Sequence, residues 1–177
     1  MQIKNSKTRF GIVAILFHWV IAILIIGLLA LGLYMVSLPW GLQTLKFYDW
    51  HKEYGLLVLF LAFFRLFWYL TNVNPELTLP LLEKIAARSM HWALYLFMFA
   101  MPITGWFLTS AAGFPPSFFG LFTLPTLIAA DPQKLALFQQ IHKWLGYALI
   151  VAISLHFAAA LKHHFINKDD ILRRMFS

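Results

Sequence analysis

Four stretches of this chain are long enough to cross a lipid bilayer and carry almost no charge. A helix needs about 20 residues to cross a hydrocarbon layer about 30 Å thick. Because 61% of the 177 residues are hydrophobic and only 12% are charged, the composition indicates a membrane as the solvent. We therefore expect an all-α integral membrane four-helix bundle, formed as one domain over residues 1–177. The stretches are Phe10 to Leu45, Tyr54 to Thr71 with Arg65 as its one charge, Ser89 to Ala130, and Trp144 to Leu161.

Breaker residues divide these stretches into helices and connections. The segment 79–88, which mixes Pro80 with apolar and charged residues, is expected to be a separate interfacial helix. The connection 111–140 is rich in Phe, Gly and Pro yet almost uncharged, so we expect it to fold over one mouth of the bundle. There it would either cap a buried cofactor or only pack on the membrane surface, and the sequence favours neither. The expected helices cover about 10–36, 49–70, 89–110 and 142–164.

Basic residues lie mainly at the ends of the expected helices. The formal net charge is +7, but the cations form no stripe with interleaved aromatic residues, so no nucleic-acid partner is expected. The first helix follows basic residues as a signal peptide would, but its apolar run is too long and no small-residue cleavage site closes it, so it should be retained. An excess of Lys and Arg marks the cytoplasmic side, which puts both termini in the cytoplasm. That side has Lys4, Lys7, Arg9, Lys84, Arg88, Lys162, Lys168, Arg173 and Arg174, and the other has Lys46, Lys52, Lys134 and Lys143.

The chain has seven histidines, and an ionisable residue inside a membrane indicates function. His142 and His156 are 14 residues apart in the fourth expected helix, which is about 21 Å along the axis and within about 40° of one face. His51 opens the second helix at the depth of His142, and His18 lies in the first helix at the depth of His156. A low-spin b haem takes one imidazole on each side of its iron. We therefore expect two haems b in the bundle core, one between His51 and His142 and one between His18 and His156.

Two glycines support haem sites, and other cofactors fit less well. Gly55 and Gly146 each follow an expected ligand by four residues and would leave room for a porphyrin ring, although glycine also serves close helix packing in membranes. Zinc or copper would need ligands that converge on one point, whereas these histidines lie at two depths. The sequence has no cysteine, which excludes disulfides, thiolate ligands and covalently attached c-type haem.

Several motifs of this sequence resemble those of the bacterial cytochrome b(561) family of di-haem quinone oxidoreductases, and more distantly the cytochrome b subunits of formate dehydrogenases and Ni,Fe hydrogenases. The resemblance covers nearly the whole chain. It implies a similar fold, the four histidines as axial ligands, electron exchange with quinone and a bacterial inner-membrane location; one activity in that family is oxidation of superoxide to oxygen with reduction of ubiquinone. The motifs are FHW at His18, DWHKEYG at His51, SMHW at His91, IHKWLGY at His142 and LHFAAALKHHF, which contains His156, His163 and His164.

Arg65, His91 and His163 are candidates for a catalytic quinone site near the inner haem. Arg65 follows His51 by 14 residues and so returns to nearly the same face at the depth of that haem. There it would meet a haem propionate or a quinone, or snorkel to lipid phosphate. The two histidines could supply the donors and protons that quinone reduction needs. Contact with lipid headgroups explains each histidine equally well.

On the outer face, Lys52 and Lys143 each directly follow an expected haem ligand, and Lys46 is close in sequence. These cations would bind haem propionates, and they would also attract a small anion. Both roles remain open on the sequence alone.

Together these features predict a protein that is surrounded by membrane lipid and transfers electrons through two haems b. The predicted donor is periplasmic, with superoxide as the first choice, and the predicted acceptor is ubiquinone. The alternative is a cytochrome b relay subunit that takes electrons from a periplasmic dehydrogenase or hydrogenase. A further rival is a histidine-lined transporter for metal or haem, which would bind its substrate reversibly and show no stable haem spectrum.

Overall fold

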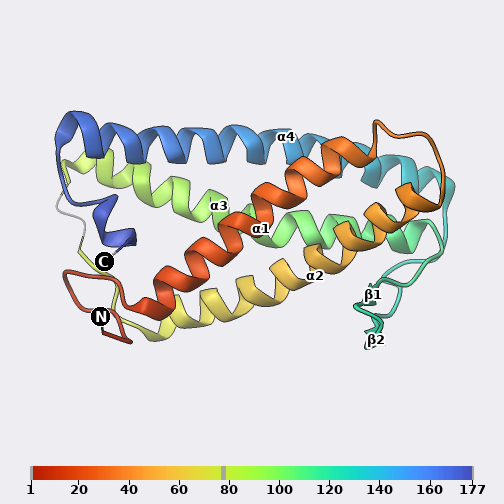
Figure 1. Ribbon diagram of the computed structural model, residues 1–177, viewed down its shortest axis with the longest axis horizontal. Coiled ribbons are helices and arrows are strands. Elements are labelled where there is room, and N and C mark those ends of the chain that lie inside the picture. Colours follow the sequence, from red (N-terminus) through yellow and green to blue (C-terminus); the bar gives the residue numbers. More distant parts are fainter. Residues whose placement is uncertain (1, 77–78, 177) are drawn as a thin grey trace.

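The computed structural model describes residues 2–76 and 79–176, most of which form four long helices (Figure 1). Successive helices run in opposite directions, so both termini lie at one end of the bundle, the terminal end, and a β-hairpin lies at the other, the hairpin end (Figure 1). Each helix is long and apolar enough to cross a membrane. The expected membrane four-helix bundle is therefore confirmed. Its helices are α1 (Ile12–Met35), α2 (Leu42–Thr71), α3 (Leu81–Ala111) and α4 (Pro132–Lys162).

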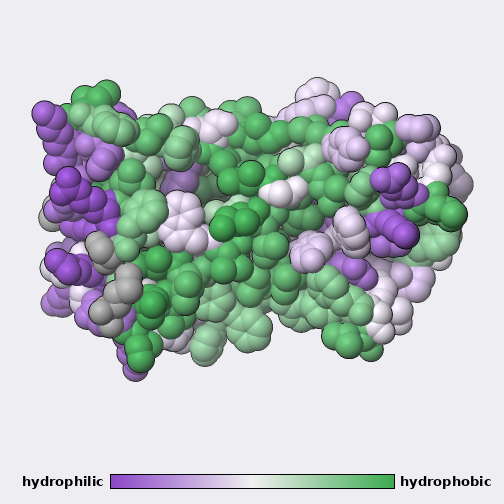
Figure 2. Space-filling model, viewed as in Figure 1, coloured by the Kyte–Doolittle hydropathy of each residue, from purple (hydrophilic) through white to green (hydrophobic). Residues whose placement is uncertain are grey.

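Each helix packs most closely against its neighbours in the sequence. A small core of Ile21, Ala62 and Met98 holds α1, α2 and α3 together, and Phe17 and Tyr95 pack around it. Few other side chains are buried, whereas many large apolar residues face outward, and Figure 2 shows a broad apolar band between two more polar ends. An apolar surface of this extent is unfavourable in water but suits the hydrocarbon of a bilayer.

Three helices begin earlier than the sequence pattern predicted. α2 begins at Leu42 instead of about residue 49, directly after Gly41. α3 begins at Leu81 instead of about residue 89, so the separate interfacial helix expected over 79–88 is wrong. Pro80 stands at the N-terminal cap of α3, and no glycine or proline follows it before Pro102. The first two turns of α3 therefore continue without interruption into the membrane span.

The start of α4 differs most from its expected position. It begins at Pro132, ten residues before the predicted start, because Asp131 caps the helix and proline suits the first helical position. The Asp131 carboxylate accepts hydrogen bonds from the backbone N–H groups of Gln133 at 2.9 Å and Lys134 at 3.1 Å. These bonds, above all the one from Lys134, hold the pKa of Asp131 below its usual range. The connection between α3 and α4 is correspondingly shorter than expected.

That connection lies at the hairpin end of the bundle, where its hairpin packs against the side of α2. Phe118 packs edge-on against Phe60 of α2, and Phe119 packs edge-on against Tyr54 of the same helix. The aromatic hairpin is thereby anchored to α2. Its antiparallel strands are β1 (Ser117–Phe118) and β2 (Phe122–Thr123).

The C-terminal segment folds back over the terminal end. After α4 the chain forms a π-helical turn over His163–Asn167 and a 3₁₀ turn over Arg173–Met175. The indole Nε1–H of Trp19 donates to the carbonyl oxygen of Met175 at 2.8 Å. This bond ties the end of the chain to α1, next to His18.

Candidate functional site

The hairpin end of the bundle holds one pair of facing histidines. His51 lies nine residues after the first residue of α2, and His142 lies ten residues after the first residue of α4. Their ring centres are 6.2 Å apart and their planes are inclined at 77°. The structure therefore brings together two residues that the sequence paired, although neither opens its helix, because both helices begin earlier than expected.

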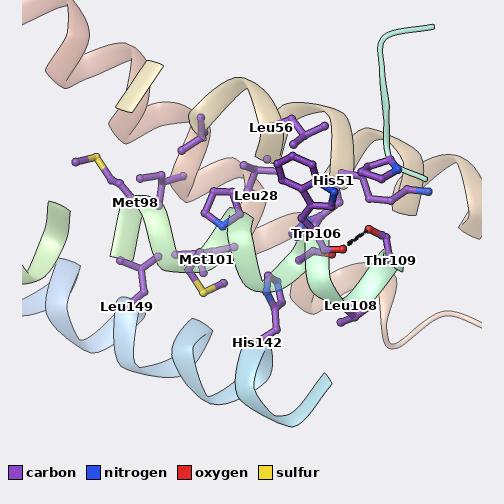
Figure 3. Close-up of a pocket in the computed structure, with 18 of the residues that line it drawn as sticks. Leu28, His51, Leu56, Met98, Met101, Trp106, Leu108, Thr109, His142 and Leu149 are labelled. Carbon is purple, nitrogen blue, oxygen red and sulfur yellow. Dashed lines mark hydrogen bonds between the residues drawn. The ribbon is translucent and has the colours of Figure 1, made fainter. Parts of the chain in front are cut away.

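Both rings line an apolar cavity of about 170 Å³ that extends toward the middle of the bundle. Figure 3 shows His142 projecting from α4 into this cavity beside Met101. Gly55 also lines the cavity, and among the described residues no atom beyond its own helix turn lies within 4 Å of the position that a side chain there would take. The corresponding position at Gly146 lies 3.8 Å from Met101 Cε. Of the two glycines singled out by spacing, Gly55 thus borders the cavity, and Gly146 packs against α3.

Two glycines that spacing did not reveal approach the rings closely. A Cβ atom at Gly32 of α1 would lie 3.1 Å from His51 Cε1, and one at Gly105 of α3 would lie 3.5 Å from His142 Cε1. The HxxxG pattern finds only glycines on the helix of the histidine itself. Gly32 and Gly105 lie on the neighbouring helices, so no signal along one helix could have found them.

The hydroxyl of Thr104 holds the His142 ring. This hydroxyl donates to the carbonyl oxygen of Met101 at 2.9 Å, so its oxygen is free to accept the hydrogen of His142 Nδ1 at 3.0 Å. The contact leaves His142 Nε2 as the ring nitrogen available to a ligand. His51 differs, because its Nδ1 is buried and has no hydrogen-bond partner among the described residues.

A second histidine pair lies farther toward the terminal end. The ring centres of His18 on α1 and His156 on α4 are 6.3 Å apart. His156 follows His142 by 14 residues, so the two pairs are about 21 Å apart along α4. The structure thus brings together the two members of each predicted pair, and it places the two pairs at different depths.

The two separations suit a pair of imidazoles on opposite sides of one metal ion. With about 2 Å for each metal–nitrogen bond and about 1 Å from each nitrogen to its ring centre, the ring centres would be about 6 Å apart. One pair joins α4 to α2, and the other joins α4 to α1. Neither of these helices packs against α4 as closely as α3 does. Over residues 2–76 and 79–176, no three His, Cys, Asp or Glu side chains form a group that could hold a metal ion. The pairs therefore fit a haem iron, which needs only two ligands from the protein.

Arg65 and His91 lie beside the terminal-end pair. Arg65 Nη2 is 3.3 Å from His18 Nδ1, and the guanidinium carbon is 5.4 Å from the centre of the Tyr95 ring. The ring centres of His91 and His156 are 5.6 Å apart, and His91 is exposed. Arg65 thus lies at the depth that its spacing predicted. The terminal-end site is more polar than the cavity at the hairpin end.

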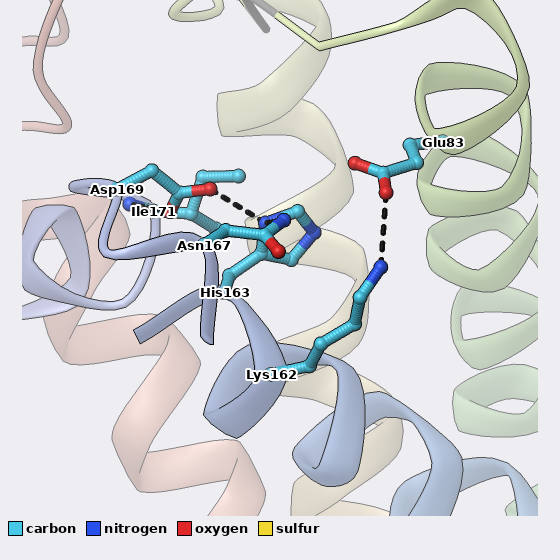
Figure 4. A network of polar contacts seen from close by, with 6 residues as sticks. All are labelled: Glu83, Lys162, His163, Asn167, Asp169 and Ile171. Carbon is cyan, nitrogen blue, oxygen red and sulfur yellow. Dashed lines mark hydrogen bonds and ion pairs between the residues drawn. The ribbon is translucent and has the colours of Figure 1, made fainter. Parts of the chain in front are cut away.

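His163, the third candidate for quinone chemistry, has different neighbours. Its Nδ1 lies 2.6 Å from the Asp169 carboxylate and 3.1 Å from Asn167 Nδ2, all within the segment that follows α4 (Figure 4). In the described part of the chain, no hydrogen bond or ring contact joins His163 to Arg65 or His91. The structure therefore brings together two of the three candidates and leaves the third in a separate polar cluster.

The three lysines expected beside the outer haem also differ in placement. Lys52 lines the apolar cavity and forms an ion pair with Asp49 at 2.7 Å. Lys143 is exposed, with its Nζ 6.0 Å from the centre of the Trp144 ring. Lys46 lines a separate hollow on the surface. Of the three, Lys52 borders the histidine cavity.

A membrane four-helix bundle with facing histidines from different helices is the architecture of a membrane cytochrome b. The sequence profile of the family described as prokaryotic cytochrome b561 matches residues 9–177. The chain belongs to this family. It is therefore a membrane electron-transfer protein of a class that binds haem b.

Named relatives agree with this placement. The chain is 37% identical over 186 residues to cytochrome b561 homolog 2 of Escherichia coli K12, covering 99% of this chain and 95% of the relative. It is 32% identical over 173 residues to cytochrome b561 homolog 1 of the same strain, covering 94% and 96%. It is also 28% identical over 182 residues to the probable superoxide oxidase CybB of Yersinia pestis, covering 99% and 97%.

Proposed function

We propose that the chain binds two haems b, one between His51 and His142 and one between His18 and His156, and carries electrons through them across the membrane. The observation that carries this proposal is the distance between ring centres, 6.2 Å in one pair and 6.3 Å in the other, which suits one iron in each. Bound haem supplies one-electron chemistry. The chain supplies two imidazoles to each iron and, having no cysteine, no covalent link to the porphyrin.

The terminal end faces the cytoplasm in this proposal, and the hairpin end faces the periplasm of a bacterial inner membrane. The support is the distribution of Lys and Arg, nine at the terminal end against four at the hairpin end. The hairpin-end pair is then the outer haem site, and the terminal-end pair is the inner one.

Superoxide is the proposed electron donor at the hairpin end. The name of the Yersinia pestis relative, probable superoxide oxidase, supports this substrate. Superoxide is an anion, and Lys52 borders the cavity of the outer pair, with Lys46 and Lys143 exposed at the same end of the bundle. Cations around such a site raise the local concentration of an anionic substrate. Each superoxide loses one electron and leaves as dioxygen.

Ubiquinone is the proposed acceptor at the terminal end. Its reduction takes two electrons, from two superoxide ions, and two protons. Arg65 and His91 lie beside the inner pair, and His91 is exposed, so a lipid-soluble quinone could reach it. These side chains can donate hydrogen bonds to the quinone oxygens. His163, held by Asp169, would relay protons at the cytoplasmic edge.

The visible spectrum and haem content of purified protein test the haem assignment. We expect a low-spin b-type spectrum and two haems per chain. His51→Ala and His142→Ala should remove one and the same spectral component, because each leaves an iron with a single ligand, and His18→Ala and His156→Ala should remove the other. If His18→Ala and His51→Ala removed the same component, the pairing would be wrong.

Rapid mixing with superoxide tests the substrates. The haems should be reduced by superoxide and reoxidised by ubiquinone, with dioxygen released. Protein that superoxide does not reduce, but that accepts electrons from a co-purified dehydrogenase or hydrogenase, would be a relay subunit instead. A chain that releases metal or haem reversibly and shows no stable spectrum would be a transporter.

A further inference from the structure

The two proposed haem sites differ in the group that lies behind one histidine of each pair. At the hairpin end, the Nδ1 of His142 faces the hydroxyl oxygen of Thr104 at 3.0 Å. At the terminal end, the Nδ1 of His18 faces the guanidinium of Arg65 at 3.3 Å. When Nε2 binds the iron, Nδ1 carries the ring hydrogen, which His142 can donate to Thr104 but which in His18 meets a group that can only donate. An acceptor therefore stands behind one ligand and a cation behind the other.

We infer that Thr104 and Arg65 are positioning residues that give the hairpin-end haem a lower reduction potential than the terminal-end haem. Electrons then move downhill from the hairpin end to the terminal end. The inference rests on the proposed function, because it requires an iron between the histidines of each pair.

Thr104 lowers the potential of the hairpin-end haem through His142. Its hydroxyl hydrogen is used by the carbonyl oxygen of Met101 at 2.9 Å, so its oxygen can only accept from the ring. A histidine that donates its second N–H to an acceptor becomes a more basic ligand. A more basic ligand stabilises ferric over ferrous iron, which lowers the reduction potential of that haem.

Arg65 has the opposite effect through His18. Guanidinium has donors and no acceptor, so it cannot take the Nδ1 hydrogen of an iron-bound His18 and cannot make this ligand more basic. Its positive charge also disfavours the extra positive charge of the oxidised haem, and this effect is strong where little water screens it. Both effects raise the reduction potential of the terminal-end haem.

The other charged groups near the two sites do not cancel this difference. Lys52 borders the hairpin-end cavity and would raise the potential there, but it is paired with Asp49 at 2.7 Å and is partly exposed to solvent. Its field is therefore largely offset and screened. Within the described residues no carboxylate pairs with Arg65, which instead contacts His18, Met98 and Tyr95. The cation at the terminal end is thus not neutralised by the protein.

Redox titration of single-haem variants tests the role of Thr104. In a His18→Ala background, which leaves only the hairpin-end haem, Thr104→Val keeps the shape but removes the acceptor, and the midpoint potential should rise. Thr104→Ser keeps the hydroxyl and should restore the potential. Thr109→Val is the matched control, because Thr109 lines the same cavity but bonds only to the helix carbonyl oxygens of Gly105 and Trp106. It should leave the potential unchanged.

The same measurement in a His51→Ala background, which leaves only the terminal-end haem, tests Arg65. Arg65→Gln removes the charge and should lower the midpoint potential. Arg65→Lys keeps the charge and should retain most of the original potential. Substitution of a residue with only a structural role would change the haem content and leave the potential of the bound haem unchanged.

The outcomes separate the inference from the function on which it rests. Two haems whose potentials do not respond to Thr104→Val and Arg65→Gln, or respond in the opposite directions, overturn the inference and leave the proposed function in place. A wild-type protein with fewer than two haems overturns both. A lower potential at the hairpin end, raised by Thr104→Val while Thr109→Val has no effect, supports the inference.

Discussion

The two ends of this bundle use the same pair of residue types in different surroundings. At the hairpin end, His51 and His142 line an apolar cavity, and Gly32 and Gly105 lie close against their rings. At the terminal end, His18 and His156 lie among Arg65, His91 and Tyr95, and His91 is exposed.

This difference shows that ligand identity and local chemistry are set by separate parts of the chain. In the proposed function, histidine spacing on α4 would set where each iron is held, and residues of α1, α2 and α3 would decide what surrounds it. An apolar site with glycines close against its rings fixes the positions of its two histidines. A polar site that is open at its edge suits exchange with a molecule from the membrane.

Gly32→Ala is expected to have the largest effect and to affect only the hairpin end. The new methyl group would lie 3.1 Å from His51 Cε1, so the ring would have to move. Overpacking of this kind costs about 1–3 kcal/mol. We expect loss of most of the hairpin-end haem and retention of the other, measured by haem content and spectrum.

Gly27→Ala is the matched control on the same helix, because a Cβ atom there would meet no other part of the described chain within 4 Å, apart from its own helix turn. It should retain both haems, and alanine should favour the helix by up to about 1 kcal/mol. Gly105→Ala, at 3.5 Å from His142 Cε1, should be tolerated better than Gly32→Ala. Full haem occupancy in Gly32→Ala would show that the hairpin-end site is looser than its geometry indicates.

His163→Leu should affect only the terminal end. It removes the group that Asp169 holds at 2.6 Å, and loss of a proton-transfer residue typically slows a reaction by about 100-fold or more. We expect slower ubiquinone reduction with both haems bound, measured by steady-state and single-turnover kinetics. His164→Leu is the control, since its Nδ1 has no partner among the described residues. Normal kinetics in His163, His91 and Arg65 variants alike would remove the basis for a quinone site at this end.

Lys52→Glu tests electrostatic attraction at the hairpin end. Reversing the charge beside the cavity should slow haem reduction by superoxide by about 10-fold at low salt, and the difference should shrink as ionic strength rises. Lys143→Glu should have a smaller effect because Lys143 is exposed and does not line the cavity. Lys84→Glu, on α3 near the terminal end, serves as the control. Altered potentials or loss of haem without a slower reaction would instead indicate that Lys52 binds a haem propionate.

The smallest expected effect is a pH dependence of stability, which arises from Asp131 at the start of α4. Its pKa is lowered in the folded protein, so its contribution to stability is fully present above the unfolded pKa of about 4 and is lost as the pH falls through the lower, folded value. Asp131→Asn keeps an oxygen that can cap the helix but should remove this pH dependence. Thermal unfolding in detergent over a range of acidic pH measures it. An equal response to pH in wild type and Asp131→Asn would contradict the assignment.

Hydropathy and spacing were enough to predict the membrane bundle, the partners of His142 and His156, and the depth of Arg65. These features depend on periodicity along single helices, which the order of residues contains. The helix starts at Leu42, Leu81 and Pro132 were missed because these helices extend beyond their apolar stretches, in α4 as far as the cap at Asp131.

Contacts between helices could not be predicted in this way. Gly32, Thr104 and Gly105 reach the histidine rings from helices that do not carry those rings, and the separation of His163 from Arg65 depends on the turn after α4. Each of these contacts depends on how neighbouring helices are rotated and shifted against one another. That arrangement results from packing of the whole bundle, so the surroundings of each histidine pair are known only from the tertiary structure.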